Sequence, residues 1–269
     1  MNLNTVSIHG VPRSGTSWLG QILNSSPDVA FRFQPLFSYR HKGALNEQSS
    51  TNEIQSFFED ILNTDDAFVL MQDPKIHVGY PQPVKHADPS HLIFKNVRYH
   101  HILQNLLERI PAHKVLAIIR DPRGVLNSWY SSPREFDPTW SLNEEWRYAA
   151  KKNLGRIEEY FGYEKWKEAA TLFMALRERY PERVLIIRYQ DLHESTSETI
   201  TEILGHIQLS HAHAIDEFIK HSKGSLIDDP NSVLRAGHRH DAWRNSLPRD
   251  ISDAIETDLK GTELEVFIT

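Results

Sequence analysis

The sequence predicts an α/β fold in which a central parallel sheet lies between two layers of helices. Short, continuous apolar runs, typical of buried strands, alternate with segments whose apolar residues recur at helical spacing. The first apolar run ends in a turn rich in glycine, proline and serine, and a helical pattern follows at once. The chain has 269 residues, 39% of them hydrophobic, which suits one large domain that we assign to residues 1–269.

Five segments have the composition of buried strands. The clearest is the run Lys-Val-Leu-Ala-Ile-Ile at residues 114–119, and residues 184–188 are similarly apolar. Runs of this kind are typical of parallel strands that are covered on both faces. The five predicted strands are residues 6–8, 28–33, 91–97, 114–119 and 184–188.

Apolar residues at helical spacing predict helices between and after these strands. The first begins at Trp18, and another begins near Pro122, because proline favours the first turn of a helix. The other predicted helices are residues 54–62, residue 102 to near Pro111, and residues 142–160, 164–179, 192–207, 212–221 and 251–259. Residues 38–51, the proline-rich stretch after residue 71 and residues 231–245 have no such pattern, and long irregular stretches are usually functional.

The composition excludes several classes of protein. The 30 Lys and Arg residues against 36 Asp and Glu give a formal net charge of −6, whereas nucleic-acid binding needs a basic surface. The absence of cysteine excludes disulfide scaffolds, zinc fingers and a cysteine nucleophile. The sequence has no apolar stretch of about 20 residues and no signal-peptide pattern, so we expect a cytoplasmic protein that does not bind membranes.

The glycine turn after the first strand has the spacing of a phosphate-binding loop. Gly10 and Gly15 are separated by four residues, as in the Walker A loop, whose backbone N–H groups converge on a phosphate. Thr16 stands where an ATPase has lysine, and Arg13 supplies a cation inside the loop. The spacing therefore predicts a P-loop-NTPase-like fold that binds an anion, and the missing lysine argues against ATP or GTP hydrolysis.

A second anion-binding pattern follows the strand predicted at residues 114–119. Arg120 lies at the carboxyl end of that strand, where ligands bind in open α/β sheets. Ser128 lies about two turns into the helix that follows. A rigid guanidinium and a hydroxyl can converge there on one phosphate.

Together the two patterns resemble those of sulfotransferases that use 3′-phosphoadenosine 5′-phosphosulfate (PAPS). The loop is closer to the carbohydrate branch, which has arginine there, than to the cytosolic branch, which has lysine. The resemblance implies that Arg13, Lys95 and Ser128 are catalytic, with Arg13 neutralising the bridging oxygen and Lys95 contacting the sulfuryl oxygens. It also implies that PAPS is bound by Arg13, Ser14, Gly15, Thr16, Ser17, Trp18, Arg120, Ser128, Tyr189, Arg235 and Gly237.

The residues that act as general base in the two branches are both replaced. Gln34 stands where the carbohydrate branch has glutamate, and Val97 stands where the cytosolic branch has histidine. Three explanations remain open. The base comes from elsewhere, with Asp73, His77 and His100 as candidates; or the acceptor is a group that loses its proton easily, such as an amine; or the protein is not catalytic.

The resemblance implies a sulfotransferase that moves a sulfuryl group from PAPS to a hydroxyl or amine by in-line displacement and releases PAP. The expected acceptor is a small molecule, a specialised metabolite or a saccharide, bound among the aromatic residues of 31–39, 73–84 and 129–146. No metal is expected, because the histidines at 211, 213, 238 and 240 have no partner pattern for a metal. The alternatives are a P-loop nucleotide kinase and a non-catalytic module that binds PAP or PAPS.

Overall fold

The computed structural model describes residues 3–72, 83–224 and 241–268. Within these residues one parallel sheet has the strand order β2-β3-β1-β4-β5. The strands are β1 (Asn4–His9), β2 (Val29–Phe33), β3 (His91–Asn96), β4 (Lys114–Ile119) and β5 (Val184–Arg188). The prediction of a central parallel sheet is confirmed, and each predicted strand is found within two residues of its expected ends.

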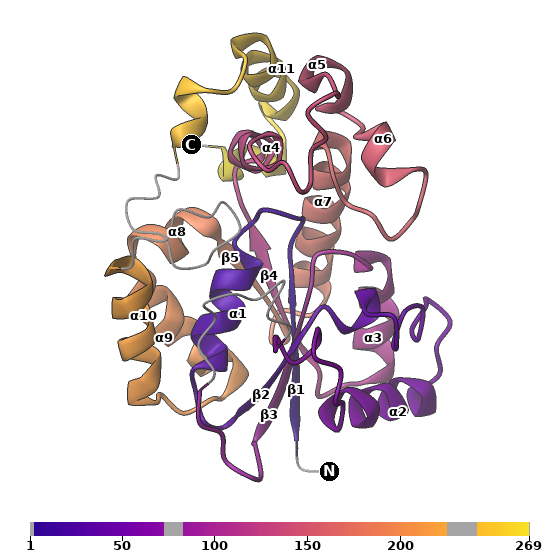
Figure 1. Ribbon diagram of the computed structural model, residues 1–269, viewed down its shortest axis with the longest axis vertical. Helices are drawn as coiled ribbons and strands as arrows, with labels where there is room; N and C mark the ends of the chain where they lie inside the picture. Colours follow the sequence, from indigo (N-terminus) through magenta and orange to yellow (C-terminus); the bar gives the residue numbers. More distant parts are fainter. Residues whose placement is uncertain (1–2, 73–82, 225–240, 269) are drawn as a thin grey trace.

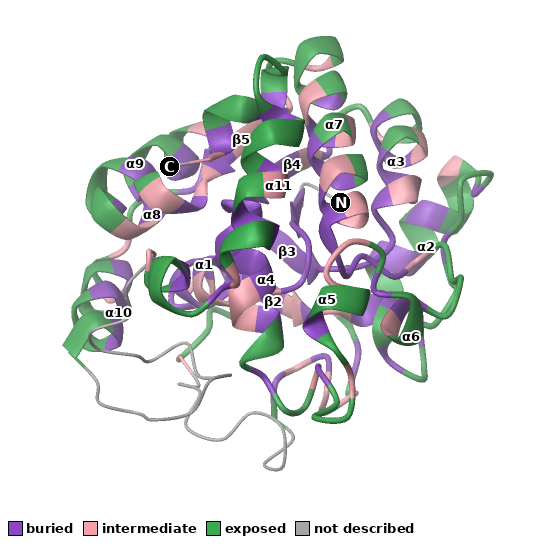
Figure 2. Cartoon of the chain, turned by 90° about the horizontal axis from the view of Figure 1, so that it is seen from above, coloured by how far each residue is buried: buried purple, intermediate pink, exposed green. Residues whose placement is uncertain are grey.

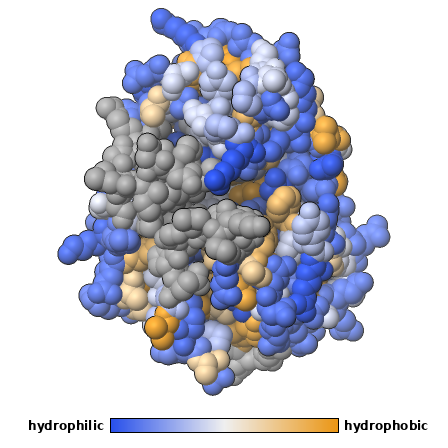
Figure 3. Space-filling view, viewed as in Figure 1, coloured by the Kyte–Doolittle hydropathy of each residue, from blue (hydrophilic) through white to orange (hydrophobic). Residues whose placement is uncertain are grey.

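The strands read as continuous apolar runs because both faces of the sheet are covered. All six residues of β3 are buried, and β1 is buried except at Asn4. Figure 2 shows the sheet buried at the centre of the molecule, while the outer faces of the helices are exposed. On the face shown in Figure 3, most of the described surface is accordingly hydrophilic, with smaller apolar areas between.

Helices cover the sheet on two sides (Figure 1). One layer contains α1 (Thr16–Asn24), α8 (Tyr189–Glu194), α9 (Thr196–Ile207) and α10 (His213–Gly224). The other contains α2 (Thr51–Leu62), α3 (Leu103–Arg109) and α7 (Tyr163–Arg179). Each layer has its own apolar core, one around Leu19 and Ile203 and the other around Phe57 and Phe173.

Beyond the carboxyl ends of the strands lies a third group of helices (Figure 1). It consists of α4 (Pro122–Tyr130), α5 (Leu142–Glu145), α6 (Ala150–Asn153) and α11 (Arg249–Leu259). Short 3₁₀ turns complete the described elements: η1 (Pro35–Phe37), η2 (His100–Ile102), η3 (Ala242–Asn245) and η4 (Glu263–Phe267). Because all the strands are parallel, the loops that follow them meet under this group of helices.

Two helix predictions are wrong. Residues 142–160 form α5, α6 and turns rather than one helix, because Ala149 and Leu154 adopt left-handed conformations with φ of 49° and 51°. Residues 192–207 are divided between α8 and α9 at Ser195, whose φ of −120° and ψ of 51° interrupt the helix. Residues 231–240 of the predicted irregular segment lie outside the described residues.

Candidate active site

The loop between β1 and α1, residues 10–15, is the predicted anion-binding loop, and we call it the cradle. Gly15 has a φ of 92°, and a Cβ on it would lie 2.6 Å from the ring of Tyr189, so the loop requires glycine twice over. The side chain of Ser14 is fully buried, and among the described residues its hydroxyl has no hydrogen-bond partner. Since an unsatisfied buried hydroxyl costs about 1–3 kcal/mol, the loop is suited to a ligand that satisfies it.

The two anion-binding patterns meet at this cradle. The Arg13 Nε donates a hydrogen bond to the Ser128 hydroxyl at 3.0 Å, across 115 residues of sequence. The Arg120 Nη1 donates to the carbonyl oxygen of Arg13, also at 3.0 Å. Two guanidinium groups are thus held at the junction of β1 and β4, next to the amino end of α1. This arrangement favours a ligand with several negative charges.

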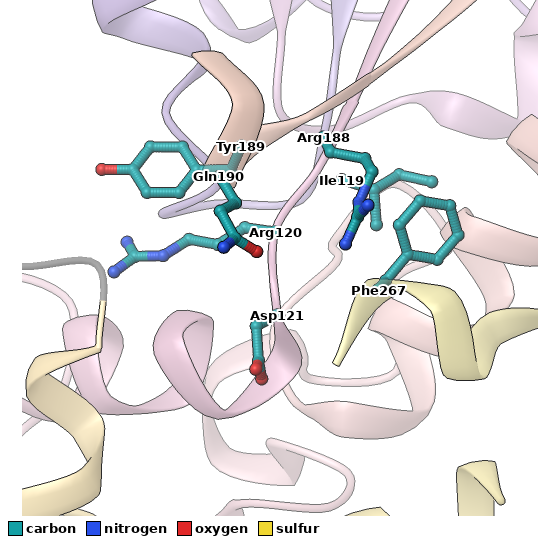
Figure 4. Close-up of a pocket in the computed structure, with 7 residues that line it drawn as sticks. All are labelled: Ile119, Arg120, Asp121, Arg188, Tyr189, Gln190 and Phe267. Atoms are coloured by element: carbon teal, nitrogen blue, oxygen red, sulfur yellow. The ribbon is translucent and has the colours of Figure 1, made fainter. Parts of the chain in front are cut away.

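Arg120 keeps its charge available for a ligand. It is 7% exposed, its guanidinium lies 4.5 Å from the ring centroid of Tyr189, and it forms no ion pair within the described parts of the chain. Its Nε is buried and has no hydrogen-bond partner there. Asp121 pairs instead with Arg123 at 2.6 Å. Figure 4 shows Arg120 extended beneath Tyr189 in a pocket that also contains Ile119, Asp121, Arg188, Gln190 and Phe267.

Arg123 has a structural role. It is buried, pairs with Asp121 and with Glu256 of α11, and lies 3.9 Å from the ring centroid of Trp243. Asp121 also accepts a hydrogen bond from the backbone N–H of Arg123 and so caps α4. These contacts hold α11 and η3 against α4, the helix that carries Ser128.

Lys95 lies beside the cradle at the carboxyl end of β3. Its Nζ donates to the Ser17 hydroxyl at 3.0 Å and lies 4.3 Å from the ring centroid of Phe33. Burial, together with the nearby charges of Arg98 and Arg13, lowers the pKa of Lys95 to about 7, although Glu135 opposes the change. A bound anion favours the charged form of such a lysine.

The predicted adenine-binding residues lie on one flank of the cradle. The indole N–H of Trp18 donates to the Ser222 hydroxyl of α10 at 3.2 Å. The rings of Trp18 and Tyr189 lie 6.3 and 6.0 Å, between centroids, from the ring of His193. The predicted residues Arg235 and Gly237 lie outside the described residues.

Of the three predicted general bases, only His100 lies within the described residues, and it is not brought to the cradle. Asp73 and His77 lie outside the described residues. His100 is fully buried, and burial holds its pKa well below the usual value. Its Nδ1 lies 3.0 Å from that of His9, and its ring packs on Tyr160 and Phe173 in the core.

The structure adds charged residues that we did not predict. The Arg98 Nη1 donates to the side-chain oxygen of Gln34 at 3.3 Å, and its Nε donates to the buried carboxylate of Glu159 at 2.8 Å. Nearby, Lys152 and Glu135 form an ion pair at 2.8 Å. No local motif reveals these pairs, although Glu135 lies within residues 129–146, which we predicted to line the acceptor pocket.

Comparison with known proteins decides the family. A model of the sulfotransferase family matches residues 5–213. The chain belongs to the sulfotransferase family. The predicted resemblance to the sulfotransferase family is therefore confirmed, and the protein is a sulfotransferase enzyme.

Solved sulfotransferase structures have the same fold. The mouse sulfotransferase SULT7A1, solved in complex with PAP, is 13% identical with a TM-score of 0.57, over 99% of this chain and 88% of that one. A sulfotransferase from Alicyclobacillus acidocaldarius is 16% identical with a TM-score of 0.52, over 99% and 96%. The sulfotransferase domain of the Synechococcus PCC 7002 olefin synthase is 18% identical with a TM-score of 0.51, over 96% and 95%. These similarities confirm the P-loop-NTPase-like fold.

A search of curated proteins finds no match to this sulfotransferase. Within residues 3–72, 83–224 and 241–268, no helix is both long and apolar enough to cross a membrane. The same ranges contain no group of three or more His, Cys, Asp or Glu residues that could hold a metal ion.

Proposed function

We propose that this sulfotransferase moves the sulfuryl group of PAPS to a hydroxyl or amine of a small molecule and releases PAP. The observation that carries the proposal is the meeting of Arg13, Arg120 and Ser128 at one cradle. PAPS has a 5′-phosphosulfate and a separate 3′-phosphate, so its two anionic groups suit two anion-binding patterns in one site. The unpartnered Ser14 hydroxyl and Arg120 Nε are polar atoms that such a ligand can satisfy.

The loop after β1 would hold the 5′-phosphate. The backbone N–H groups and hydroxyls of residues 14–17 lie at the amino end of α1, which favours an anion. When bound, PAPS supplies an activated sulfuryl group with PAP as the leaving group. Arg13 and Lys95 would stabilise the negative charge that grows as that group leaves, because both cations are already fixed by hydrogen bonds.

The remaining part of PAPS would lie along the ends of β4 and β5. Arg120 and Ser128 would hold the 3′-phosphate, and we also assign Arg235 and Gly237 to it. Tyr189 and Trp18 offer aromatic faces for the adenine. Catalysis then consists mainly of aligning the acceptor with the sulfur and of stabilising charge, as in phosphoryl transfer.

The replacement of the usual general base favours a second candidate function, which is the binding of PAP or PAPS without catalysis. Gln34 is an amide engaged by Arg98, so it cannot accept a proton usefully. A protein that only binds PAP or PAPS would have this feature and would release no PAP. Because the chain belongs to a family of enzymes and its cations are fixed by hydrogen bonds, we propose sulfuryl transfer, and binding alone is an outcome of the test.

Two measurements test the proposed function. Incubation with PAPS and a library of phenols, sugars and amines should yield PAP and a product heavier by one SO₃, detected by mass spectrometry. Calorimetry should show that Arg120→Ala weakens PAP binding by about 10- to 100-fold, as expected when a charged hydrogen bond is lost. The control is Arg109→Ala, at the exposed end of α3, which should bind as the parent does.

An Arg120→Ala variant that binds PAP as tightly as the parent would overturn the assignment of the 3′-phosphate site. Tight PAP binding without product from any acceptor in the library would favour the binding module.

A further inference from the structure

The proposed reaction needs a proton acceptor that neither usual position supplies. An alcohol attacking sulfur must lose its proton, and a side chain positioned nearby typically accelerates such a step by about 10²–10⁴-fold. Gln34 cannot accept this proton, and Val97 has no ionisable group. The following inference rests on the proposed function and concerns the same site.

Two carboxylates form ion pairs with cations that lie over the ring of Phe161, and they differ in accessibility. The side chain of Glu159 is 8% exposed and accepts a hydrogen bond from Arg98, whose own side chain is 10% exposed. Glu159 therefore neutralises a buried cation, and its removal would leave that charge uncompensated. The side chain of Glu135 is 33% exposed, so an acceptor can reach it.

The backbone holds Glu135 in a fixed position after α4. Its N–H donates to the carbonyl oxygen of Ser132 at 2.9 Å. Its carbonyl oxygen accepts a hydrogen bond from the buried indole of Trp129 at 3.1 Å. Trp129 is the residue after Ser128, so the helix that presents Ser128 to the cradle also fixes the position of Glu135.

A single cation orients the carboxylate of Glu135. The Lys152 Nζ lies 2.8 Å from Oε2 and 4.9 Å from the ring centroid of Phe161. Among the described residues this carboxylate has no other ion pair, so it remains able to contact an acceptor. The ring of Phe161 also lies 5.7 Å from the Arg98 guanidinium, which donates a hydrogen bond to Gln34, so the pair of Glu135 and Lys152 stands on the Gln34 side of the site.

We propose that Glu135 is the general base and that Lys152 positions its carboxylate. The acceptor O–H or N–H gives its proton to the Glu135 carboxylate while the acceptor lone pair forms a bond to sulfur. The bond between sulfur and the bridging oxygen breaks, and its electron pair leaves on the 5′-phosphate of PAP. The proton departs later from the Glu135 carboxyl group to water, so atoms and charge balance.

The test compares Glu135→Gln with the parent on two phenols. A tyrosine-like phenol, with a pKa of about 10, needs a base near neutral pH. A nitro-substituted phenol is largely ionised and does not. Glu135→Gln should lower kcat on the first phenol by about 10²–10⁴-fold, with a much smaller effect on the second and unchanged PAP affinity.

Further variants complete the experiment. Glu144→Gln removes the partner of Lys151 from an exposed ion pair nearby, and it should keep the parental kcat. Lys152→Met should lower kcat on the tyrosine-like phenol more than on the nitro-substituted phenol, and Lys152→Arg should restore it, because a cation at this place orients the carboxylate. Glu159→Gln should keep the parental ratio of the two rates. Thermal unfolding identifies any variant that loses activity because it fails to fold.

The outcomes separate the two proposals. A Glu135→Gln variant with parental kcat on the tyrosine-like phenol would overturn the assignment of Glu135 and leave the proposed function standing. A folded Glu159→Gln variant that loses kcat on the tyrosine-like phenol alone, while Glu135→Gln keeps it, would assign the base to Glu159 instead. A parent that binds PAP but sulfates neither phenol nor any library acceptor would overturn both proposals.

Discussion

The half of the site that we propose for the nucleotide (the nucleotide half) and the half that we propose for the acceptor (the acceptor half) are built in different ways. The nucleotide half uses residues that directly follow strands, such as the loop after β1 and Arg120 after β4. The acceptor half uses side chains from loops between helices, such as Glu135 and Glu159, which are paired with Lys152 and Arg98. The difference teaches that the edge of a sheet can fix the binding position of one substrate, while the surrounding loops can fix the binding position of the other.

The largest expected effect tests whether the acceptor half depends on its buried ion pair. Glu159→Gln leaves the buried guanidinium of Arg98 without a carboxylate, which should lower the free energy of unfolding by about 3–5 kcal/mol. PAP affinity should stay close to that of the parent, because the cradle is built from other elements. Urea unfolding and calorimetry measure the two effects.

A matched control for this variant is Glu108→Gln, which removes an exposed ion pair with Arg179. Its effect on the free energy of unfolding should be at most about 1 kcal/mol. Equal losses in Glu108→Gln and Glu159→Gln would show that the buried pair has no special role in the acceptor half.

A smaller effect is expected in the nucleotide half from Gly15→Ala. The φ of 92° and the ring of Tyr189 both oppose a Cβ, so the free energy of unfolding should fall by about 1–3 kcal/mol. PAP affinity should fall as well, because the loop itself shifts. Gly43→Ala is the control, since its φ is also positive, at 71°, but no atom lies within 4 Å of the added Cβ.

The ring contact contributes only if Gly15→Ala loses more stability than Gly43→Ala. Equal losses would mean that backbone strain explains the whole effect and that Tyr189 yields to the added methyl group.

The last prediction concerns the boundary between the two halves, where Lys95 lies, and its effect is small for each pH unit. Its pKa is about 7 when folded and near the ordinary 10.5 when unfolded, so the unfolded chain binds more protons between these values. The parent should therefore gain stability as pH rises from about 7 to about 10.5, with a slope of at most about 1.4 kcal/mol per pH unit from this group. Below pH 7 both states are protonated and the slope from Lys95 disappears.

Urea unfolding of the parent and of Lys95→Met over this pH range isolates the contribution of Lys95. The stability difference should favour Lys95→Met most at pH 6 and shrink towards pH 10. A difference that does not change with pH would mean that Lys95 stays charged in the folded protein.

The sequence predicts those parts of the fold and of the site in which the residues that act together are also adjacent in the chain. The run at residues 114–119 indicates a buried strand by itself, and Arg120 lies next to it. The pairing of Arg98 with Glu159 spans 61 residues and has no periodic pattern, so we did not foresee it. The helix predicted at residues 142–160 is wrong for a similar reason, because apolar spacing gives no sign of left-handed backbone at Ala149 and Leu154.

The contacts of Arg123 have a consequence for how far the chain can be truncated at its C-terminal side and still fold. The family match ends at residue 213, yet Glu256 and Trp243 surround the Arg123 guanidinium beside α4. Residues 247–267 also contribute apolar side chains to the same core as Phe173. A chain that ended at residue 213 would lack the residues that cover α4, and part of the apolar core would be exposed to solvent. The unit that folds is therefore longer than the unit that defines the family.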